Sequence, residues 1–187
     1  IEFLDGAAPN HVKNFTDLSR DGFYDGTLFH RIIPGFMIQG GDPNTISGDP
    51  NTWGQGGPDE TLDAEFNKIK HNRGIVSMAR SADPNSAGSQ FFIVHRDSNS
   101  LDEEYTVFGR LVTESSFDTL DKIAAVQTGT NDRPIDPEQV KIIKITIASR
   151  SDVPDIMDLG IPELTESLTS EFSGSQNEIF ESQELDV

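Results

Sequence analysis

The chain has 187 residues, 34% of them hydrophobic, and its formal net charge is −18. This length suits one domain with a sizeable core plus an appendage, and the negative charge argues against nucleic-acid binding, which depends on Lys and Arg at the phosphates. The absence of cysteine excludes disulfides and thiolate chemistry, and no apolar run approaches the roughly 18 residues of a membrane span.

The first 43 residues predict a strand, a helix and a hairpin, in that order. Residues 1–4 are typical of the end of a strand, so we expect the start of that strand to be missing. Pro9 begins a helix whose apolar residues share one face up to Asp21. Residues 29–43 then give two short apolar strands joined by a Pro-Gly turn.

Arg31 lies inside this hairpin among apolar residues, and Gln39 follows on the second strand. A cation in an apolar wall is costly unless another group satisfies it. The hairpin therefore either holds a structural ion pair or lines a site.

The middle of the chain predicts more short strands than helices. A turn-rich loop covers residues 41–61, and Ser115 or Ser116 could cap a helix at 117–127. Further strands are expected at residues 75–80, 90–95, 106–112 and 139–148. Short strands with only two helices favour a β-barrel or a sandwich over an α/β layer fold.

The composition changes near residue 149. Residues 149–187 contain ten Asp and Glu and one Arg, which gives them half of the total net charge. Apolar residues between Met157 and Phe172 recur near helical spacing. This acidic extension is either a solvated tail or an amphipathic segment that docks on a protein partner or on the body.

Several familiar site patterns fail in this sequence. The glycine-rich stretch 53–58 lacks the Lys-Ser/Thr of a phosphate-binding loop, and the four histidines have no metal-ligand spacing. Residues 97–108 do not complete a calcium loop, and no serine lies in a nucleophile elbow. We therefore expect no metal and no cofactor.

What remains is a set of apolar side chains with a few hydrogen-bond donors, namely Arg31, Gln39 and Gln90 beside Phe36, Met37, Phe92 and Leu101. Rotation about an Xaa–Pro peptide bond needs only such a groove, because no bond breaks. A guanidinium that donates to the prolyl nitrogen would favour the twisted, non-conjugated amide of the transition state.

The sequence resembles the cyclophilin-type peptidyl-prolyl cis-trans isomerases. The matching motifs fall in order across residues 1–148, at residues 29–42, 77–79, 88–93, 101–102 and 107–109. The resemblance implies a mainly β fold, a closed eight-stranded antiparallel barrel capped by two α-helices. Residues 149–187 lie outside it.

The resemblance also implies roles for individual residues. Arg31 matches the catalytic arginine, Gln39 the glutamine that orients it, and Phe36 the catalytic phenylalanine of the proline pocket. The remaining positions match substrate-binding residues: Met37, Gly54, Ala79, Arg80, Ser81, Gln90, Phe92, Leu101 and Tyr105. Ala79 to Ser81 would pair through the main chain with an extended substrate.

Three departures from the family pattern affect these expectations. Tyr105 replaces a histidine of many members, and we expect activity to survive because a phenol can still pack and donate. Ser100 replaces the tryptophan of cyclosporin-sensitive members, which predicts weak or no cyclosporin binding. The run from Arg80 differs from the common one and is one residue longer, which predicts an altered preference before the proline.

The sequence therefore predicts an isomerase that acts on proline-containing peptides and unfolded proteins and assists protein folding. Two alternatives stay open: a non-enzymatic module that grips proline-containing segments, and a chaperone-like role carried by the charged extension. Arg31 favours the enzyme, because a pure binder needs no donor at the prolyl nitrogen. A monomer and a cytoplasmic location are further expectations.

Overall fold

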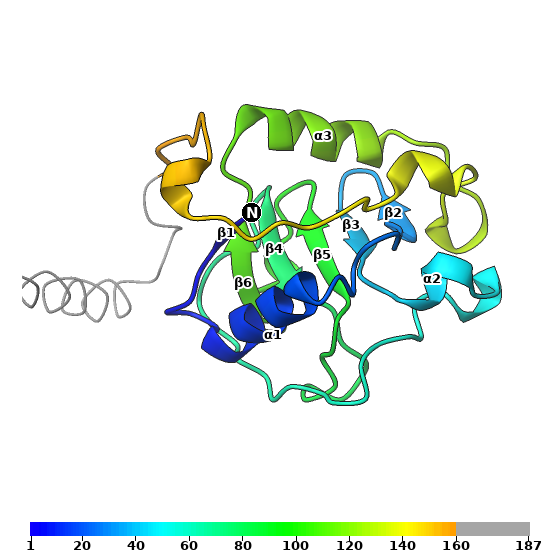
Figure 1. The fold of residues 1–187 in the computed structure, drawn as a ribbon, viewed down its shortest axis with the longest axis horizontal. Helices are drawn as coiled ribbons and strands as arrows, with labels where there is room; N and C mark the ends of the chain where they lie inside the picture. Colours follow the sequence, from blue (N-terminus) through cyan, green and yellow to red (C-terminus); the bar gives the residue numbers. More distant parts are fainter. Residues whose placement is uncertain (160–187) are drawn as a thin grey trace, which may run out of the picture.

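The computed structural model describes residues 1–159, and its centre is one antiparallel β-sheet (Figure 1). Six strands form this sheet in the order β1-β6-β4-β5-β3-β2. The strands are β1 (Glu2–Phe3), β2 (Arg31–Ile33), β3 (Met37–Gly40), β4 (Ile75–Met78), β5 (Phe91–Val94) and β6 (Val107–Arg110). The prediction of a mainly β fold with few helices is confirmed.

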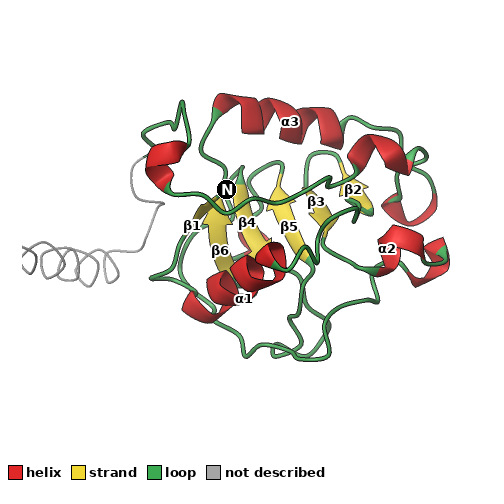
Figure 2. Cartoon of the chain, viewed as in Figure 1, coloured by secondary structure: helices red, strands yellow, loops and turns green. Residues whose placement is uncertain are grey.

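Helices flank the sheet on more than one side (Figure 2). The α-helices are α1 (Pro9–Arg20), α2 (Asn44–Ser47) and α3 (Glu114–Ala124). Helix α1 packs against β6, and α3 packs against β2 and β3. The 3-10 helices are η1 (Pro50–Thr52), η2 (Asn99–Leu101), η3 (Thr130–Asp132), η4 (Pro137–Val140) and η5 (Arg150–Asp152). Within residues 1–159, no helix has the length and apolar character that a membrane crossing requires.

Both long helices begin where local chemistry favours a start, although one start differs from the prediction. Pro9 occupies the first turn of α1, where its missing N–H costs nothing. Helix α3 begins at Glu114, earlier than the predicted 117, because Thr113 is the cap. The Thr113 side chain accepts a hydrogen bond from the backbone N–H of Ser116, so neither Ser115 nor Ser116 is the cap.

The closed eight-stranded barrel is the part of the prediction that the structure contradicts. The predicted strand at 139–148 forms η4 and then an extended segment, whose one β-bridge within residues 1–159 pairs Lys141 with Leu28. Ile142 exchanges two backbone hydrogen bonds of 2.7 Å with residues 26 and 27, and Ile143 is 84% exposed. Residues 143–148 form no backbone hydrogen bond with any other segment of residues 1–159, so the six-stranded sheet stays open there.

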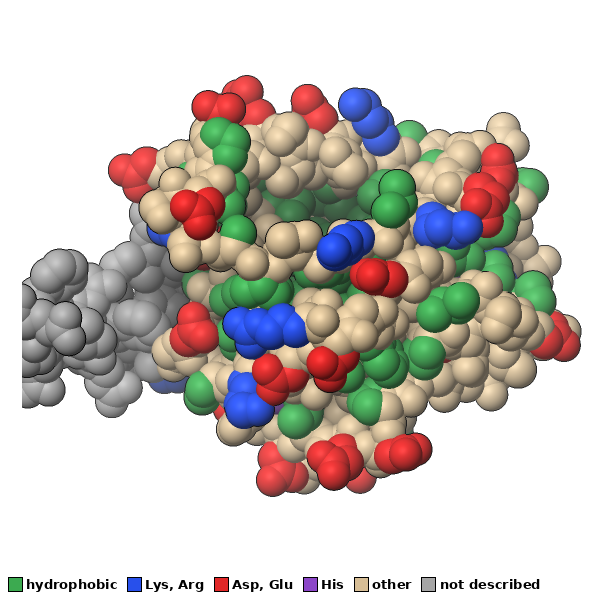
Figure 3. All heavy atoms as spheres, viewed as in Figure 1, with side chains coloured by type: hydrophobic (Ala, Val, Ile, Leu, Met, Phe, Trp, Pro, Cys, Tyr) green, Lys and Arg blue, Asp and Glu red, His purple; other side chains and the backbone are tan. Residues whose placement is uncertain are grey.

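Two cavities lie beside the open sheet. One cavity of about 540 Å³ lies between β1 and residues 145–148, and a second of about 310 Å³ lies under α3. Figure 3 shows this recess below α3, with hydrophobic side chains on its floor. The sheet thus has an apolar face that the described chain does not cover completely.

Buried apolar side chains form two clusters on the sheet. The larger cluster holds α1 and α3 on the sheet through residues such as Phe15, Phe108 and Leu120. The smaller one contains Met37 and Phe92, with partly buried neighbours that include Phe36 before β3, Ala79 after β4 and Leu101 and Tyr105 after β5. This second cluster is where the apolar and aromatic residues of the predicted site meet.

Candidate active site

The β2–β3 hairpin places Arg31 directly opposite Gln39. The two strands pair antiparallel, with Arg31 against Gln39 and Ile33 against Met37. Gly35 turns the chain with a φ of +78°, a left-handed conformation that glycine adopts without strain. The amide N–H of Gly35 donates to Nδ1 of His95 at 2.8 Å, which fixes the turn next to Phe36.

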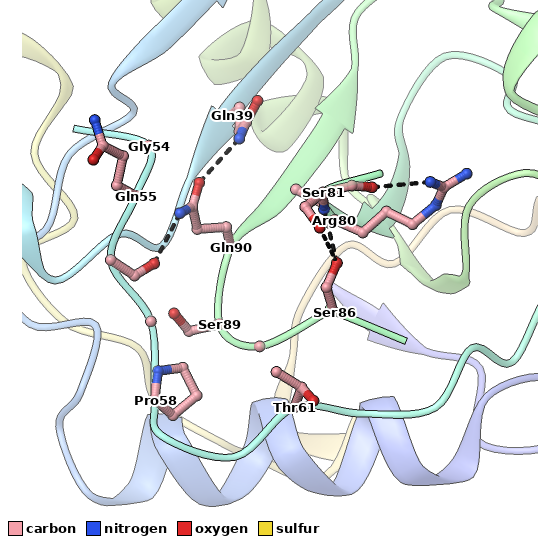
Figure 4. Close-up of a pocket in the computed structure, with 14 residues that line it drawn as sticks. Gln39, Gly54, Gln55, Pro58, Thr61, Arg80, Ser81, Ser86, Ser89 and Gln90 are labelled. Atoms are coloured by element: carbon pink, nitrogen blue, oxygen red, sulfur yellow. Dashed lines mark hydrogen bonds between the residues drawn. The ribbon is translucent and has the colours of Figure 1, made fainter. Parts of the chain in front are cut away.

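A chain of amide groups extends from the guanidinium of Arg31. Its Nη1 lies 3.5 Å from Oε1 of Gln39, and Nε2 of Gln39 donates to Oε1 of Gln90 at 3.0 Å. Nε2 of Gln90 in turn donates to the carbonyl of Gly56 at 2.8 Å. Figure 4 shows Gln39 and Gln90 joined in this way. Each amide therefore fixes the orientation of the next.

The predicted apolar pocket lies beside Arg31. Its volume is about 270 Å³, and the residues that line it are Arg31, Phe36, Met37, Gln39, Ala79, Arg80, Phe92, Leu101 and Tyr105. All nine are residues that the sequence assigned to the site. They come from β2, β3 and the turn between them, from β5, from η2 and from the loops after β4 and η2.

Strand register explains why these side chains share one face. Gln39 on β3 lies opposite Phe92 on β5, and Phe92 lies opposite Ser77 on β4. The ring of Phe92 meets the ring of Tyr105 edge to face, with 5.5 Å between the centroids. The floor of the pocket is thus sheet, and its far wall is the loop that follows η2.

A second, more polar cavity of about 450 Å³ adjoins the pocket (Figure 4). It contains the three remaining predicted residues, Gly54, Ser81 and Gln90, and it shares Ala79 and Arg80 with the pocket. Ser81 donates to Oγ of Ser86 through its backbone N–H at 2.9 Å.

Buried Asp42 holds one wall of this second cavity. Its carboxylate accepts from the backbone N–H of Asn44 at 2.8 Å and from the backbone N–H of Gly54. A Cβ at Gly56 would clash with Oδ1 of Asp42, so any other residue there would displace this carboxylate. The 42–58 loop is therefore tied to the end of β3.

Arg80 separates the two cavities, and its guanidinium is committed to the protein. Nε and Nη2 donate to the carbonyl of Glu104 at 3.0 and 2.9 Å, and Nη1 donates to the carbonyl of Ser81 at 3.0 Å. The same group lies 4.7 Å from the centre of the Tyr105 ring. With these partners Arg80 braces the wall that Tyr105 forms.

A buried polar chain lies behind the pocket. Nδ1 of His71 is 3.2 Å from Asp102, Nε2 is 3.1 Å from Oγ of Ser77, and that hydroxyl donates to the carbonyl of Thr106 at 2.8 Å. Burial lowers the pKa of His71, and Asp102 opposes this shift. Ser77 and His71 are completely buried, so this Ser-His-Asp arrangement supports the fold and does not face the pocket.

The sequence did not single out two groups that the structure brings to the site. The carboxylate of Asp132 lies 3.6 Å from Nε of Arg31, and the carbonyl of Gly56 ends the amide chain. Asp132 is about a hundred residues away in sequence, and a backbone carbonyl has no side-chain signal. Among residues 1–159, no cluster of His, Asp and Glu could hold a metal ion.

Comparison with known proteins identifies the family. The model of the cyclophilin-type peptidyl-prolyl cis-trans isomerase family matches residues 1–147. The peptidyl-prolyl cis-trans isomerase CYP18-1 of Arabidopsis thaliana is 44% identical over 141 residues, which cover 74% of this chain and 82% of that protein. The peptidyl-prolyl cis-trans isomerase-like 1 of Gibberella zeae is 42% identical over 154 residues, covering 81% and 90%.

A solved structure agrees with these sequence matches. A cyclophilin-type peptidyl-prolyl cis-trans isomerase of Cryptosporidium parvum, crystallised in the presence of the dipeptide Ala-Pro, superimposes with a TM-score of 0.70. It is 37% identical in sequence, and the match covers 79% of this chain and 90% of that one.

Proposed function

The chain belongs to the cyclophilin-type peptidyl-prolyl cis-trans isomerases. From this we propose that it catalyses cis/trans isomerisation of Xaa–Pro bonds, with Arg31 as the hydrogen-bond donor to the prolyl nitrogen. The observation that carries the proposal is the position of Arg31 on the rim of an apolar pocket. Gln39 lies opposite it on the paired strand.

The reaction requires few catalytic groups beyond this arrangement. Amide resonance makes a barrier of about 18–20 kcal/mol, and resonance is lost when the bond twists. The prolyl nitrogen then becomes pyramidal and gains a lone pair that can accept a hydrogen bond. A donor that meets this lone pair stabilises the transition state more than the planar amide and so accelerates rotation.

The pocket supplies the other half of the mechanism. Phe36, Met37, Phe92 and Leu101 offer an apolar surface for the pyrrolidine ring. Placing the ring there withdraws the amide from water, which strengthens the hydrogen bond from Arg31. The relative solved with Ala-Pro supports proline-containing peptides as the substrate class for this chain.

The proposal is tested by cis/trans exchange of an Ala-Pro-type peptide, measured by NMR with wild type and Arg31→Ala. We expect fast exchange in wild type, collapse in Arg31→Ala and nearly unchanged peptide affinity in both. Arg20→Ala is the matched control, because Arg20 is an exposed arginine on α1 that pairs with Asp17. Binding without accelerated exchange in wild type would leave only the proline-binding module.

The remaining expectations are part of the same proposal. We expect unfolded proteins as substrates, and hence assistance to protein folding, from a monomer in the cytoplasm. The acidic extension would recruit a protein partner. Most of its amphipathic stretch lies outside the described residues. In the described part of the extension, the backbone N–H of Met157 donates to the backbone carbonyl of Val112 at 2.8 Å, and Arg150 forms an ion pair with Glu2.

A further inference from the structure

Helix η3 carries Asp132 on an unusual piece of backbone. Asn131 and Asp132 are consecutive residues with φ values of +61° and +59°. Non-glycine residues adopt this left-handed conformation at a cost, and such residues collect at functional sites. Two in succession keep the Asp132 side chain in a direction that an ordinary turn would not give.

The loop around η3 is closed on itself. The backbone N–H of Gly129 donates to the carbonyl of Arg133 at 2.8 Å, and that of Ile135 donates to Gln127 at 2.9 Å. Residues 128 and 134 form an antiparallel bridge between these two hydrogen bonds. Asp132 is therefore presented by a fixed loop next to β2.

Asp132 and Gln39 hold Arg31 from two directions. Oδ2 of Asp132 lies 3.6 Å from Nε of Arg31, and Oε1 of Gln39 lies 3.5 Å from Nη1. Among the described residues, no hydrogen bond occupies Nη2 of Arg31. Two of the three nitrogens thus have protein partners, and the third is left for a ligand.

This ion pair is poorly placed to stabilise the fold. The side chains of Arg31 and Asp132 are 44% and 48% exposed, and ion pairs between exposed groups contribute little to stability. The loop nevertheless keeps a strained backbone that points the carboxylate at the arginine. What this geometry can do is orient the guanidinium of Arg31.

We propose that Asp132 is a positioning residue, which orients the Arg31 guanidinium so that Nη2 meets the prolyl nitrogen. This inference rests on the proposed function, because it takes Arg31 to be the donor to the prolyl nitrogen. It goes beyond that function in extending the site to a loop a hundred residues away.

The test uses the full chain and a blocked Ala-Pro peptide without charge. Asp132→Asn should lower kcat/KM about fivefold, through kcat, with peptide Kd within twofold of wild type. Asp132→Glu, which keeps the charge, should recover part of the loss. Asp136→Asn is the matched control: its carboxylate lies in the same loop but accepts from Gln139 at 2.7 Å and does not contact Arg31.

Two further readouts separate positioning from a general structural effect. In the Arg31→Ala background, Asp132→Asn should cause no additional loss, because the two residues act as one unit. The Nε–Hε resonance of Arg31 should move in Asp132→Asn and stay in place in Asp136→Asn.

The possible failures are distinct. Fast wild-type exchange together with a normal Asp132→Asn variant overturns the inference and leaves the proposed function intact. An equal loss in the presence and absence of Arg31 also overturns it, as does a loss confined to peptides with Lys or Arg, which would make Asp132 a substrate contact. Wild type without accelerated exchange overturns both proposals.

Discussion

Gln39 faces Arg31 across the β2–β3 pair, and its amide accepts from Arg31 on one side while it donates to Gln90 on the other. The carbonyl oxygen of Gln39 must point to Arg31, because its NH₂ group is engaged by Gln90. The polarity of the amide chain thus fixes which end of Gln39 meets the guanidinium.

Replacing Gln39 should therefore reduce turnover more than binding. In Gln39→Ala, Arg31 loses its partner on Nη1, and we expect kcat/KM for an Ala-Pro-type peptide to fall about tenfold, mainly through kcat. NMR exchange and peptide titration measure the two effects separately. Gln139→Ala, an exposed glutamine in η4, is the control; a Gln39→Ala variant with normal kcat would contradict the orienting role.

Replacing Arg80 should weaken the wall between the two cavities. Arg80→Met removes three backbone contacts of a guanidinium whose side chain is only 15% exposed, and we expect it to cost about 1–3 kcal/mol of unfolding free energy. KM for the peptide should rise as Tyr105 loses its support.

Urea unfolding and peptide kinetics measure both effects of Arg80→Met. Tyr105→Phe is the companion variant: it removes only a hydroxyl that makes no hydrogen bond among the described residues, so stability and KM should stay near wild type. Equal behaviour of Arg80→Met and wild type would show that the wall does not need the guanidinium.

Cyclosporin should bind weakly, and the cause can be isolated. Ser100 lies in η2, one residue before Leu101 of the pocket, where the resemblance places tryptophan in cyclosporin-sensitive members. Ser100→Trp adds a large apolar surface and one N–H donor, and we expect it to tighten cyclosporin binding at least tenfold. Calorimetric titration of wild type and Ser100→Trp with cyclosporin measures the two affinities. Tight binding of cyclosporin to wild type would contradict the prediction.

Acidification below pH 6.5 should destabilise the fold. Burial lowers the pKa of His30 and the pKa of His71 from the usual 6.5. Below that pH the unfolded chain binds more protons than the folded one, so the stability present above pH 6.5 is lost as the pH falls. We expect the free energy of unfolding to drop by about 1 kcal/mol or more between pH 7 and pH 5.

Urea titrations followed by circular dichroism at several pH values measure this slope. His30→Gln should make it shallower, because one of the two buried imidazoles no longer titrates. A free energy of unfolding that rises from pH 7 to pH 5 would show that these histidines are not held neutral.

Removal of residues 149–187 should leave peptide turnover nearly unchanged. Every residue of the pocket lies between positions 31 and 105. The deletion removes the Arg150–Glu2 pair and the Met157–Val112 hydrogen bond, so thermal stability should fall slightly. Thermal unfolding and NMR exchange of the truncated chain test this, and a large loss of turnover would show that the extension completes the fold or the site.

The sequence was most informative where local pattern and chemistry coincide. The turn at residues 34 and 35, the alternation around it and the single arginine predict the hairpin and one side of the pocket. Phe92 and Leu101 were grouped with them as remaining apolar residues, and family resemblance assigned them to the pocket, since side chains far apart in sequence meet only after strand pairing. The structure places all of them around one cavity.

The errors arose where structure depends on distant partners. Residues 139–148 alternate like a strand, yet an extended segment becomes a strand only when a neighbour accepts its hydrogen bonds, and few are available there. Thr113 caps α3 in place of the serines because its own backbone is extended. Asp132 was missed because no spacing rule connects it to Arg31.

The double attachment of Asp42, to Asn44 and to Gly54, means that the groove is assembled before any peptide arrives. A substrate that enters the groove does not have to order the 42–58 loop, so association should not wait for that loop to rearrange. The conformational entropy of the 42–58 loop is thus lost once, on folding, and substrate binding does not lower it again at each turnover.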